Sequence, residues 1–313
     1  MSEIAIKTTG LRKRYRSHLG LSLPPTLDGL SLNVREHEVF GFLGKNGAGK
    51  TTTIKILCGL VRQSEGEAQI FGHSTREKQA RSLIGYLPES PYFYEYLTPR
   101  ETMDFYGQLN GATRAERQTR WDYLSELLHL REIADQRVRD FSKGMRQRLG
   151  FAVALAGDPK LLILDEPMSG LDPMGRTMVR DLILRLRDEQ KTIFFSSHIL
   201  GDVEQVCDRV GMLVNGTLRR EGALHELLTR ETIRVDVLTH GVPEDLASTL
   251  RQDAQQVHKG NEGVCFSFAT HEEADAAARQ IYAAAGTILA LTPISETLEE
   301  YFMRQQQEEG DAS

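Results

Sequence analysis

A glycine-rich stretch at residues 44–52, GKNGAGKTT, limits what this chain can fold into more than any other part of its sequence. It fits the phosphate-binding pattern G-x-x-x-x-G-K-[ST] at Gly44, Gly49, Lys50 and Thr51. Glycines let the backbone turn without a Cβ in the way, so that successive N–H groups can point inward and wrap a phosphate. The pattern therefore predicts a nucleotide phosphate site, with a chance Gly-rich turn as the alternative.

The segments on either side of this stretch agree with that prediction. Residues 39–43 form an apolar run typical of a buried strand, and residues 52–60 repeat apolar side chains at helical spacing. A helix that begins here directs the positive end of its dipole at the bound anion. Lys50 adds a cation for the β- and γ-phosphates, and the Thr51 hydroxyl is a suitable ligand for a Mg²⁺ ion that bridges them.

The composition sets the class of protein. A chain of 313 residues with 40% hydrophobic content can bury one large core and a second, smaller one. The net charge of −6 argues against a nucleic-acid partner, because such binders normally carry a basic stripe. No apolar run approaches the ~20 residues that span a bilayer, so we expect a cytoplasmic protein. The cysteines, Cys58, Cys207 and Cys265, lie far apart, which fits a reducing compartment.

A pair of acidic residues follows a second buried strand. Residues 161–164 are apolar throughout, as in a central parallel strand, and they lead into Asp165 and Glu166. Two adjacent carboxylates are costly to bury without a partner, and a metal ion supplies one. We assign Asp165 to Mg²⁺, usually through water, and Glu166 to polarising an attacking water. The alternative is a strand that simply surfaces in acidic residues.

A histidine and a tight loop are expected near the same edge of the sheet. The buried strand at 192–196 delivers His198 to its carboxyl end, where open α/β sheets bind ligands. His198 is therefore a candidate for contact with the γ-phosphate. Tyr15, before a predicted loop at 16–26, could stack on an adenine ring or simply pack at the end of a strand.

A helical insertion at about 97–157 interrupts the alternation of strands and helices. Thr98 begins it with a capping box and a proline at the first helical position. Ser142 is a natural N-cap for the last helix of the insertion. With Gly144 beside it, this helix start is either an anion site or only the capped end of a core helix.

Together these segments resemble the ATPase subunit of an ATP-binding cassette (ABC) transporter over about residues 3–225. The Walker A motif is GKNGAGKT at 44–51, the signature is FSKGM at 141–145, Walker B is LLILDE at 161–166, and the D-loop is SGLD at 169–172, with His198 as the H-loop histidine. The resemblance implies an α/β fold of the P-loop NTPase type, with a mixed sheet and a helical insertion. It implies that ATP is bound by Tyr15, Gly44, Asn46, Gly47, Ala48, Gly49, Lys50, Thr51, Thr52, Ser142, Gly144 and Asp172, that Mg²⁺ is bound by Thr51, Asp165 and Glu89, and that Glu166, His198 and Lys50 act in catalysis.

The same resemblance implies how the protein works. Two copies would pair head to tail, with ATP between Walker A of one chain and Ser142 and Gly144 of the other. The ATPase would drive a separate transmembrane permease, bound peripherally at the inner face of the cell membrane. The FSKGM signature is similar to that of export cassettes for drug, antibiotic, lipid or polysaccharide permeases. The alternatives are a soluble cassette ATPase of translation or DNA repair and a P-loop nucleotide kinase.

Two positions depart from the family pattern. The signature usually reads LSGGQ, and here Phe141, Lys143 and Met145 replace the leucine, one glycine and the glutamine. The Q-loop normally has a glutamine after its strand, where this chain has Glu89. A carboxylate at that position puts the usual coupling to Mg²⁺ and to the permease in question.

The sequence predicts that the cassette occupies residues 1–228. Residues 229–305 alternate strands at 233–237, 264–268 and 287–291 with helices at 243–251, 271–285 and from Ser295 onward. This pattern is typical of a small α+β domain, with a ferredoxin-like arrangement as the candidate. Three roles are consistent with such a domain: contact in a homodimer, regulation, or a contribution to stability alone. Residues 306–313 are polar and are predicted to be disordered.

Overall fold

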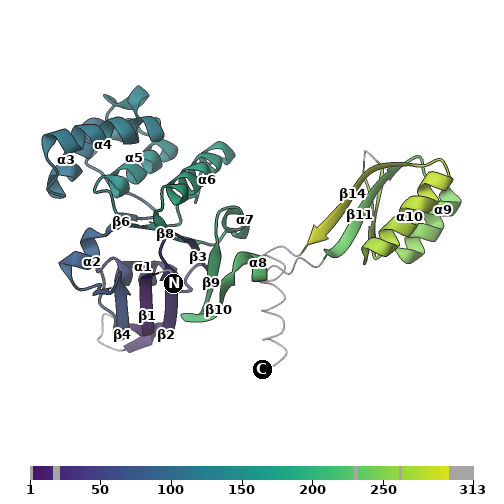
Figure 1. Cartoon of the computed structure of the whole chain (residues 1–313), viewed down its shortest axis with the longest axis horizontal. Helices are drawn as coiled ribbons and strands as arrows, with labels where there is room; N and C mark the ends of the chain where they lie inside the picture. Colours follow the sequence, from purple (N-terminus) through teal and green to yellow (C-terminus); the bar gives the residue numbers. More distant parts are fainter. Residues whose placement is uncertain (1–2, 17–21, 228–231, 261–262, 296–313) are drawn as a thin grey trace. The chain divides into compact units, whose positions relative to one another are not determined.

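The computed structural model describes residues 3–16, 22–227, 232–260 and 263–295. The chain forms two compact units that divide between Leu224 and His225, slightly before the predicted boundary after residue 228 (Figure 1). In the described ranges, no helix is both long and apolar enough to cross a membrane. Each unit has its own hydrophobic core.

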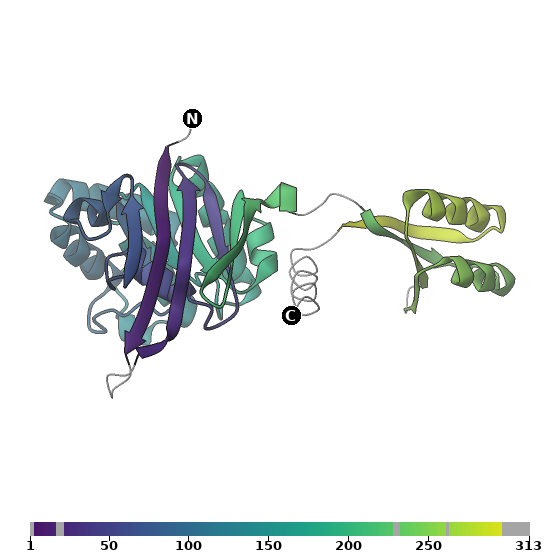
Figure 2. The same ribbon diagram turned by 90° about the horizontal axis from the view of Figure 1, so that it is seen from below.

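One layer of the first unit is an antiparallel sheet, visible as purple and blue strands in Figure 2. It contains β1 (Ile4–Arg16), β2 (Ser22–Arg35), β4 (Glu65–Ile70) and β5 (His73–Ser74), in the order β2-β1-β4-β5. The prediction of a loop from Arg16 to Thr26 was wrong for Arg16, which ends β1, and for Ser22–Thr26, which belong to β2. Pro24 and Pro25 are tolerated there because β2 is the edge strand of this sheet.

The second layer is a mixed sheet. It contains β3 (Val39–Leu43), β6 (Ile84–Leu87), β7 (Leu161–Asp165), β8 (Thr192–Ser197), β9 (Arg209–Val214) and β10 (Thr217–Ala223), in the order β10-β9-β3-β8-β7-β6. The neighbouring strands run parallel except for β10. The carboxyl ends of β3, β7 and β8 therefore lie at one edge, as the sequence predicted. The β9–β10 hairpin turns at Asn215 and Gly216, both with positive φ.

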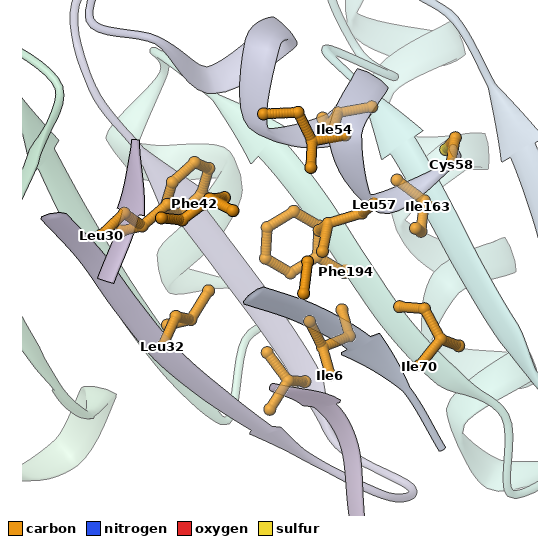
Figure 3. Close-up of a cluster of buried hydrophobic side chains, with 14 of the residues drawn as sticks. Ile6, Leu30, Leu32, Phe42, Ile54, Leu57, Cys58, Ile70, Ile163 and Phe194 are labelled. Carbon is orange, nitrogen blue, oxygen red and sulfur yellow. The ribbon is translucent and has the colours of Figure 1, made fainter. Parts of the chain in front are cut away.

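Helix α1 (Lys50–Leu57) packs between the two sheets, as Figure 3 shows. Its Ile54 and Leu57 meet Ile6 and Leu32 from the antiparallel sheet and Phe194 from the mixed sheet. Each fully buried side chain of this size contributes about 1.5–3 kcal/mol of transfer free energy. This burial fixes the start of α1, and hence the phosphate loop, against both sheets. The remaining helices of the core are α2 (Lys78–Ser82), α6 (Pro173–Asp188) and α7 (Leu200–Glu204), and α8 (Leu224–Leu227) lies at the division between the units.

The helical insertion contains α3 (Pro99–Leu109), α4 (Arg114–Leu127) and α5 (Lys143–Leu155), with short 3₁₀ turns at Arg131–Ile133 and Val138–Asp140. The predicted capping box at the start of α3 is confirmed. The Thr98 N–H donates to Glu101 Oε2 at 2.8 Å, and the Glu101 N–H donates to Thr98 Oγ1 at 3.3 Å. The predicted N-cap of α5 is also confirmed, because Ser142 Oγ accepts from the Met145 N–H at 3.3 Å.

The second unit has the element order β-α-β-β-α-β, which is the ferredoxin-like order. It consists of β11 (Thr232–His240), α9 (Glu244–Asp253), β12 (Gln256–Lys259), β13 (Val264–Phe268), α10 (His271–Ala283) and β14 (Thr287–Ser295). The strands are antiparallel in the order β12-β13-β11-β14. The sequence did not predict β12, because Val257 is its one apolar residue and an exposed edge strand has little hydrophobic pattern. The closing helix predicted from Ser295 is wrong at Ser295, which ends β14, and the rest of that helix and the predicted tail lie outside the described residues.

Candidate functional site

The phosphate loop joins β3 to α1 and depends on its glycines. Gly47 and Gly49 have φ values of 83° and 112°, a region that L side chains rarely adopt. A Cβ on Gly44 would lie 2.6 Å from the Leu213 carbonyl oxygen. Gly49 is the N-cap of α1 and has no side chain to cap the helix. The backbone N–H groups at the start of this helix are therefore left to an incoming anion.

A cavity of about 350 Å³ opens beside this loop. It is lined by Thr26, Lys45, Asn46, Gly47, Gly49, Lys50, Thr51, Thr52, Glu89, Glu166, Ser169 and His198. The structure thus brings together residues from the Walker A, Q-loop, Walker B and H-loop positions. Gly44 and Ala48 belong to the loop itself. Asp165 lies next to it through its contact with Thr51.

Lys50 is buried and already has partners in this site. Its Nζ donates to the Gly44 carbonyl oxygen at 2.6 Å and lies 3.1 Å from Glu166 Oε1. A buried ammonium without a counter-charge would be costly, so the carboxylate of Glu166 offsets its desolvation. Phosphate oxygens in the cavity would offer the same cation a second anionic partner.

The two carboxylates at the end of β7 have different surroundings. Asp165 Oδ1 accepts from Ser196 Oγ at 2.7 Å and from Thr51 Oγ1 at 3.4 Å. Glu166 Oε2 lies 2.8 Å from His198 Nδ1. Among the described residues, Glu166 Oε1 has no hydrogen-bond partner, because its contact with Lys50 is an ion pair without hydrogen-bond geometry. Asp165 is thus held by hydroxyl donors, whereas Glu166 keeps one buried oxygen available.

The backbone of Glu166 is strained. Its φ is 50°, in the left-handed region, which costs a residue with a side chain about 1–2 kcal/mol. The contacts of Glu166 with Lys50 and His198, and its N–H bond to Ser196 Oγ at 3.0 Å, hold it there. Strain that the surroundings maintain in this way is common at functional sites.

The donor set near Thr51 suits Mg²⁺. Thr51 Oγ1 and Asp165 Oδ1 are 3.4 Å apart and supply the hydroxyl and carboxylate oxygens that this hard cation prefers. No group of three or more His, Cys, Asp or Glu side chains in the described part of the chain could hold a metal by itself. Mg²⁺ typically completes its coordination with substrate phosphates and water, so two protein oxygens fit it. Glu89 is exposed and lines the same cavity, which leaves its metal role a prediction.

Four predicted site residues lie elsewhere in the described part of the first unit. Tyr15 is at the end of β1, with Lys13 Nζ 4.8 Å from its ring centroid. Ser142 is exposed at the start of α5, with Gly144 in the first turn of that helix. Asp172 caps α6 by accepting from the Gly175 N–H at 2.9 Å. A single chain therefore presents an incomplete version of the predicted nucleotide site.

Sequence reasoning missed Ser196, which contacts both Asp165 and Glu166, and it did not assign Thr26, Lys45 or Ser169 to the site. The parallel pairing of β7 with β8 places Ser196 opposite Asp165. The sequence signal that could have identified Ser196 is a polar residue near the end of an otherwise apolar strand.

Asp202 on α7 was also missed. Its Oδ2 is buried without a hydrogen-bond partner among the described residues. Burial raises the pKa of this carboxyl, while the positive charges of Arg176 and Arg180 lower it. Asp202 therefore adds a titratable group to the electrostatic surroundings of His198 and Glu166.

Comparison with known proteins places this chain in a family. The ABC transporter family model matches residues 27–169. An uncharacterized ABC transporter ATP-binding protein of Synechocystis sp. is 39% identical over 311 residues, which cover 97% of this chain and 85% of the relative. The chain therefore belongs to the ABC transporter family, as an ATP-binding subunit, and the domain that defines this family is an ATPase that binds ATP.

Two other similar proteins have more specific descriptions. The bacitracin transport ATP-binding protein BcrA of Bacillus licheniformis is 42% identical over 219 residues, which cover 69% of each chain. A solved structure described as a dimeric, post-hydrolysis state of the ATP-binding cassette MJ0796 bound to ADP and Pi is 25% identical. Its TM-score is 0.64, and the match covers 70% of this chain and 98% of that one.

Proposed function

We propose that this chain hydrolyses ATP with Mg²⁺ as a homodimer and thereby powers export through a separate transmembrane permease. The observation that carries the proposal is the cavity in which Lys50, Thr51 and Glu166 converge on the phosphate loop. Lys50 supplies a cation for phosphate, and Thr51 supplies a hydroxyl next to the Asp165 carboxylate. Glu166 supplies a buried carboxylate oxygen with no hydrogen-bond partner among the described residues.

Each of these residues has a distinct part in hydrolysis. Lys50 exchanges its contact with Glu166 for the β- and γ-phosphate oxygens when ATP binds. Thr51 and Asp165 would hold Mg²⁺, which would supply positive charge next to the phosphates. Oε1 of Glu166 accepts a proton from water as the water oxygen attacks the γ-phosphorus and the bond to ADP breaks. His198, 2.8 Å from the other carboxylate oxygen, orients Glu166 and reaches toward the γ-phosphate.

The dimer completes the site. Ser142 is exposed at the N-terminus of α5, where a helix start favours an anion. In a head-to-tail pair, Ser142 and Gly144 of one copy would meet the ATP held by the phosphate loop of the other. The similar cassette MJ0796 is described as dimeric, which supports this pairing. Tyr15, which is partly exposed, would stack on the adenine.

An aromatic surface supports the permease as a partner. In the segment after Glu89, Tyr92 and Tyr96 are 83% and 62% exposed. The ring of Tyr96 lies 5.8 Å from that of Tyr94, centroid to centroid, and exposed apolar groups that lie together mark interaction sites. The same segment is tied to the insertion, because the Arg139 N–H donates to the Glu95 carbonyl oxygen at 3.0 Å, three residues before Ser142. A permease bound here would sense both the Q-loop position and the signature helix, and would hold the chain at the inner face of the membrane.

The direction of transport is proposed from the signature. FSKGM is similar to signatures of export cassettes, and BcrA, at 42% identity, is described as a bacitracin transport protein. The description of BcrA favours a transport partner over the translation and DNA-repair alternatives.

Purification of the tagged chain from detergent-solubilised membranes of its native cell tests the proposal. We expect a membrane protein with several spanning helices to co-purify in stoichiometric amount and to raise the ATPase rate. A Tyr92→Ser, Tyr96→Ser variant should lose this partner while still binding ATP. Tyr282→Ser, which changes a tyrosine of the second unit about as exposed as Tyr96, is the matched control. Stoichiometric co-purification of soluble translation or repair factors instead would contradict the transport function.

A further inference from the structure

Ser196 is the buried hydroxyl that touches both carboxylate residues of the site. It is the fifth residue of β8 and is 0% exposed. Its Oγ donates to Asp165 Oδ1 at 2.7 Å and accepts from the Glu166 N–H at 3.0 Å. The parallel register of β7 and β8 sets Ser196 beside Asp165, so this contact follows from the pairing of the strands.

One contact supplies a hydrogen-bond donor to a buried carboxylate, and the other supports a strained backbone. The Asp165 carboxylate is buried, and its other hydrogen bond, from Thr51 Oγ1, is long at 3.4 Å. Ser196 is thus its close donor and sets the direction of its second oxygen. Glu166 has a left-handed backbone, which persists only when surrounding contacts hold it. The bond from its N–H to Ser196 is one of those contacts.

We propose that Ser196 is a positioning residue that aims Asp165 at the metal and holds Glu166 where its carboxylate meets water. The inference rests on the proposed hydrolysis of Mg²⁺-ATP and adds a residue to it. Ser196 acts through its two neighbours, since its hydroxyl bonds to both of them and is closed to solvent.

Mg²⁺ titration of nucleotide binding by the full chain tests this role apart from turnover. The probe is AMP-PNP, an ATP analogue that is not hydrolysed, with binding followed by calorimetry. In Ser196→Ala, the Mg²⁺ concentration for half-maximal binding should rise about 10- to 100-fold, as for loss of an outer partner of a metal ligand. Affinity measured in EDTA should stay near the wild-type value, because the phosphate loop keeps its contacts. Ser196→Thr retains the hydroxyl and should return the titration toward wild type.

Ser125→Ala is the matched control. Ser125 is also 0% exposed, but its Oγ donates to the Asp122 carbonyl oxygen in the helical insertion. Its Mg²⁺ titration should equal that of the wild type. In an Asp165→Asn background, Ser196→Ala should add little, since the partner through which Ser196 acts on the metal has already lost its charge.

Several outcomes would overturn the inference. One is a Ser196→Ala protein that is folded by circular dichroism and titrates like Ser125→Ala. Another is a full effect of Ser196→Ala in the Asp165→Asn background. If the alanine variant does not fold, Ser196→Cys takes its place, because a thiol keeps the shape of the side chain but is a weak hydrogen-bond donor. A Mg²⁺ titration of Ser196→Cys that equals the wild type then counts against the role of Ser196. A wild-type protein whose AMP-PNP binding ignores Mg²⁺ would instead refute the proposed function, and the inference with it.

Discussion

Replacing Glu166 with glutamine should separate ATP hydrolysis from ATP binding. The amide keeps the size of the side chain but cannot accept a proton from water. Loss of a positioned general base typically costs 10²–10⁴-fold, or about 3–5 kcal/mol in the activation free energy. The backbone of the phosphate loop does not depend on Glu166, so we expect the variant to bind ATP with a Kd no weaker than that of the wild type. Lys50→Ala should instead weaken binding from the start.

The structure also predicts a stability effect that depends on nucleotide. Glu166→Gln removes the counter-charge 3.1 Å from the buried Lys50 ammonium. Breaking a buried pair typically costs about 3–5 kcal/mol. The bond from Lys50 to the Gly44 carbonyl oxygen remains, so we expect about 2 kcal/mol, or a fall in Tm of about 4–8 °C without nucleotide. ATP phosphates would restore a counter-charge, so the gain in Tm on adding ATP should be larger in the variant than in the wild type.

Three measurements check this prediction. They are the single-turnover ATPase rate, the Kd for ATP, and Tm with and without nucleotide; size-exclusion chromatography should also show an ATP-bound dimer of the variant. Glu126→Gln, at an exposed position in the insertion, is the control for the substitution itself. A wild-type hydrolysis rate in Glu166→Gln would refute the role of Glu166. An equal ATP-induced gain in Tm for both proteins would refute the exchange of partners by Lys50.

Glu89→Gln should keep the ATPase rate within about tenfold, a change of ~1.4 kcal/mol, and should alter its Mg²⁺ dependence, because a carboxylate next to the metal adds a charge that an amide lacks; an unchanged Mg²⁺ titration would count against any metal role. In a variant with its native cysteines replaced, Gly47→Cys and Ser142→Cys should form a disulfide-linked dimer on oxidation with ATP, because Cα atoms must come within about 7 Å; an internally bridged monomer on a non-reducing gel would argue against the head-to-tail site. Asp158→Asn should lower the free energy of unfolding at neutral pH by only about 0.2–1 kcal/mol, because the Asp158 side chain, paired with Lys191, is 66% exposed. The Lys191 ammonium holds the pKa of Asp158 below its ordinary 3.8, so this stability is present above that pH and is lost as pH falls through the folded-state pKa; a difference between the two proteins in urea unfolding that stays constant from pH 7 to pH 3 would contradict this.

The sequence by itself determined the features that depend on residues near one another in the chain. The phosphate loop, the capping box at Thr98 and Glu101 and the hairpin at Asn215 and Gly216 each occupy a few consecutive residues. Their backbone conformations follow from missing Cβ atoms and from side chains that bond to the next turn. The alternation of apolar strands and helices likewise showed which strand ends would meet at one edge of a sheet.

Only the tertiary structure decided which distant groups become partners. Ser22–Thr26 joined β2 despite two prolines, because an edge strand can dispense with the N–H groups that prolines lack. Lys50 pairs with Glu166, and Ser196 forms hydrogen bonds with both Asp165 and Glu166, although these residues are far apart in the chain. Such contacts depend on the register of β7 against β8 and on the packing of α1 between two sheets, and neither leaves a pattern in the residues around any one position.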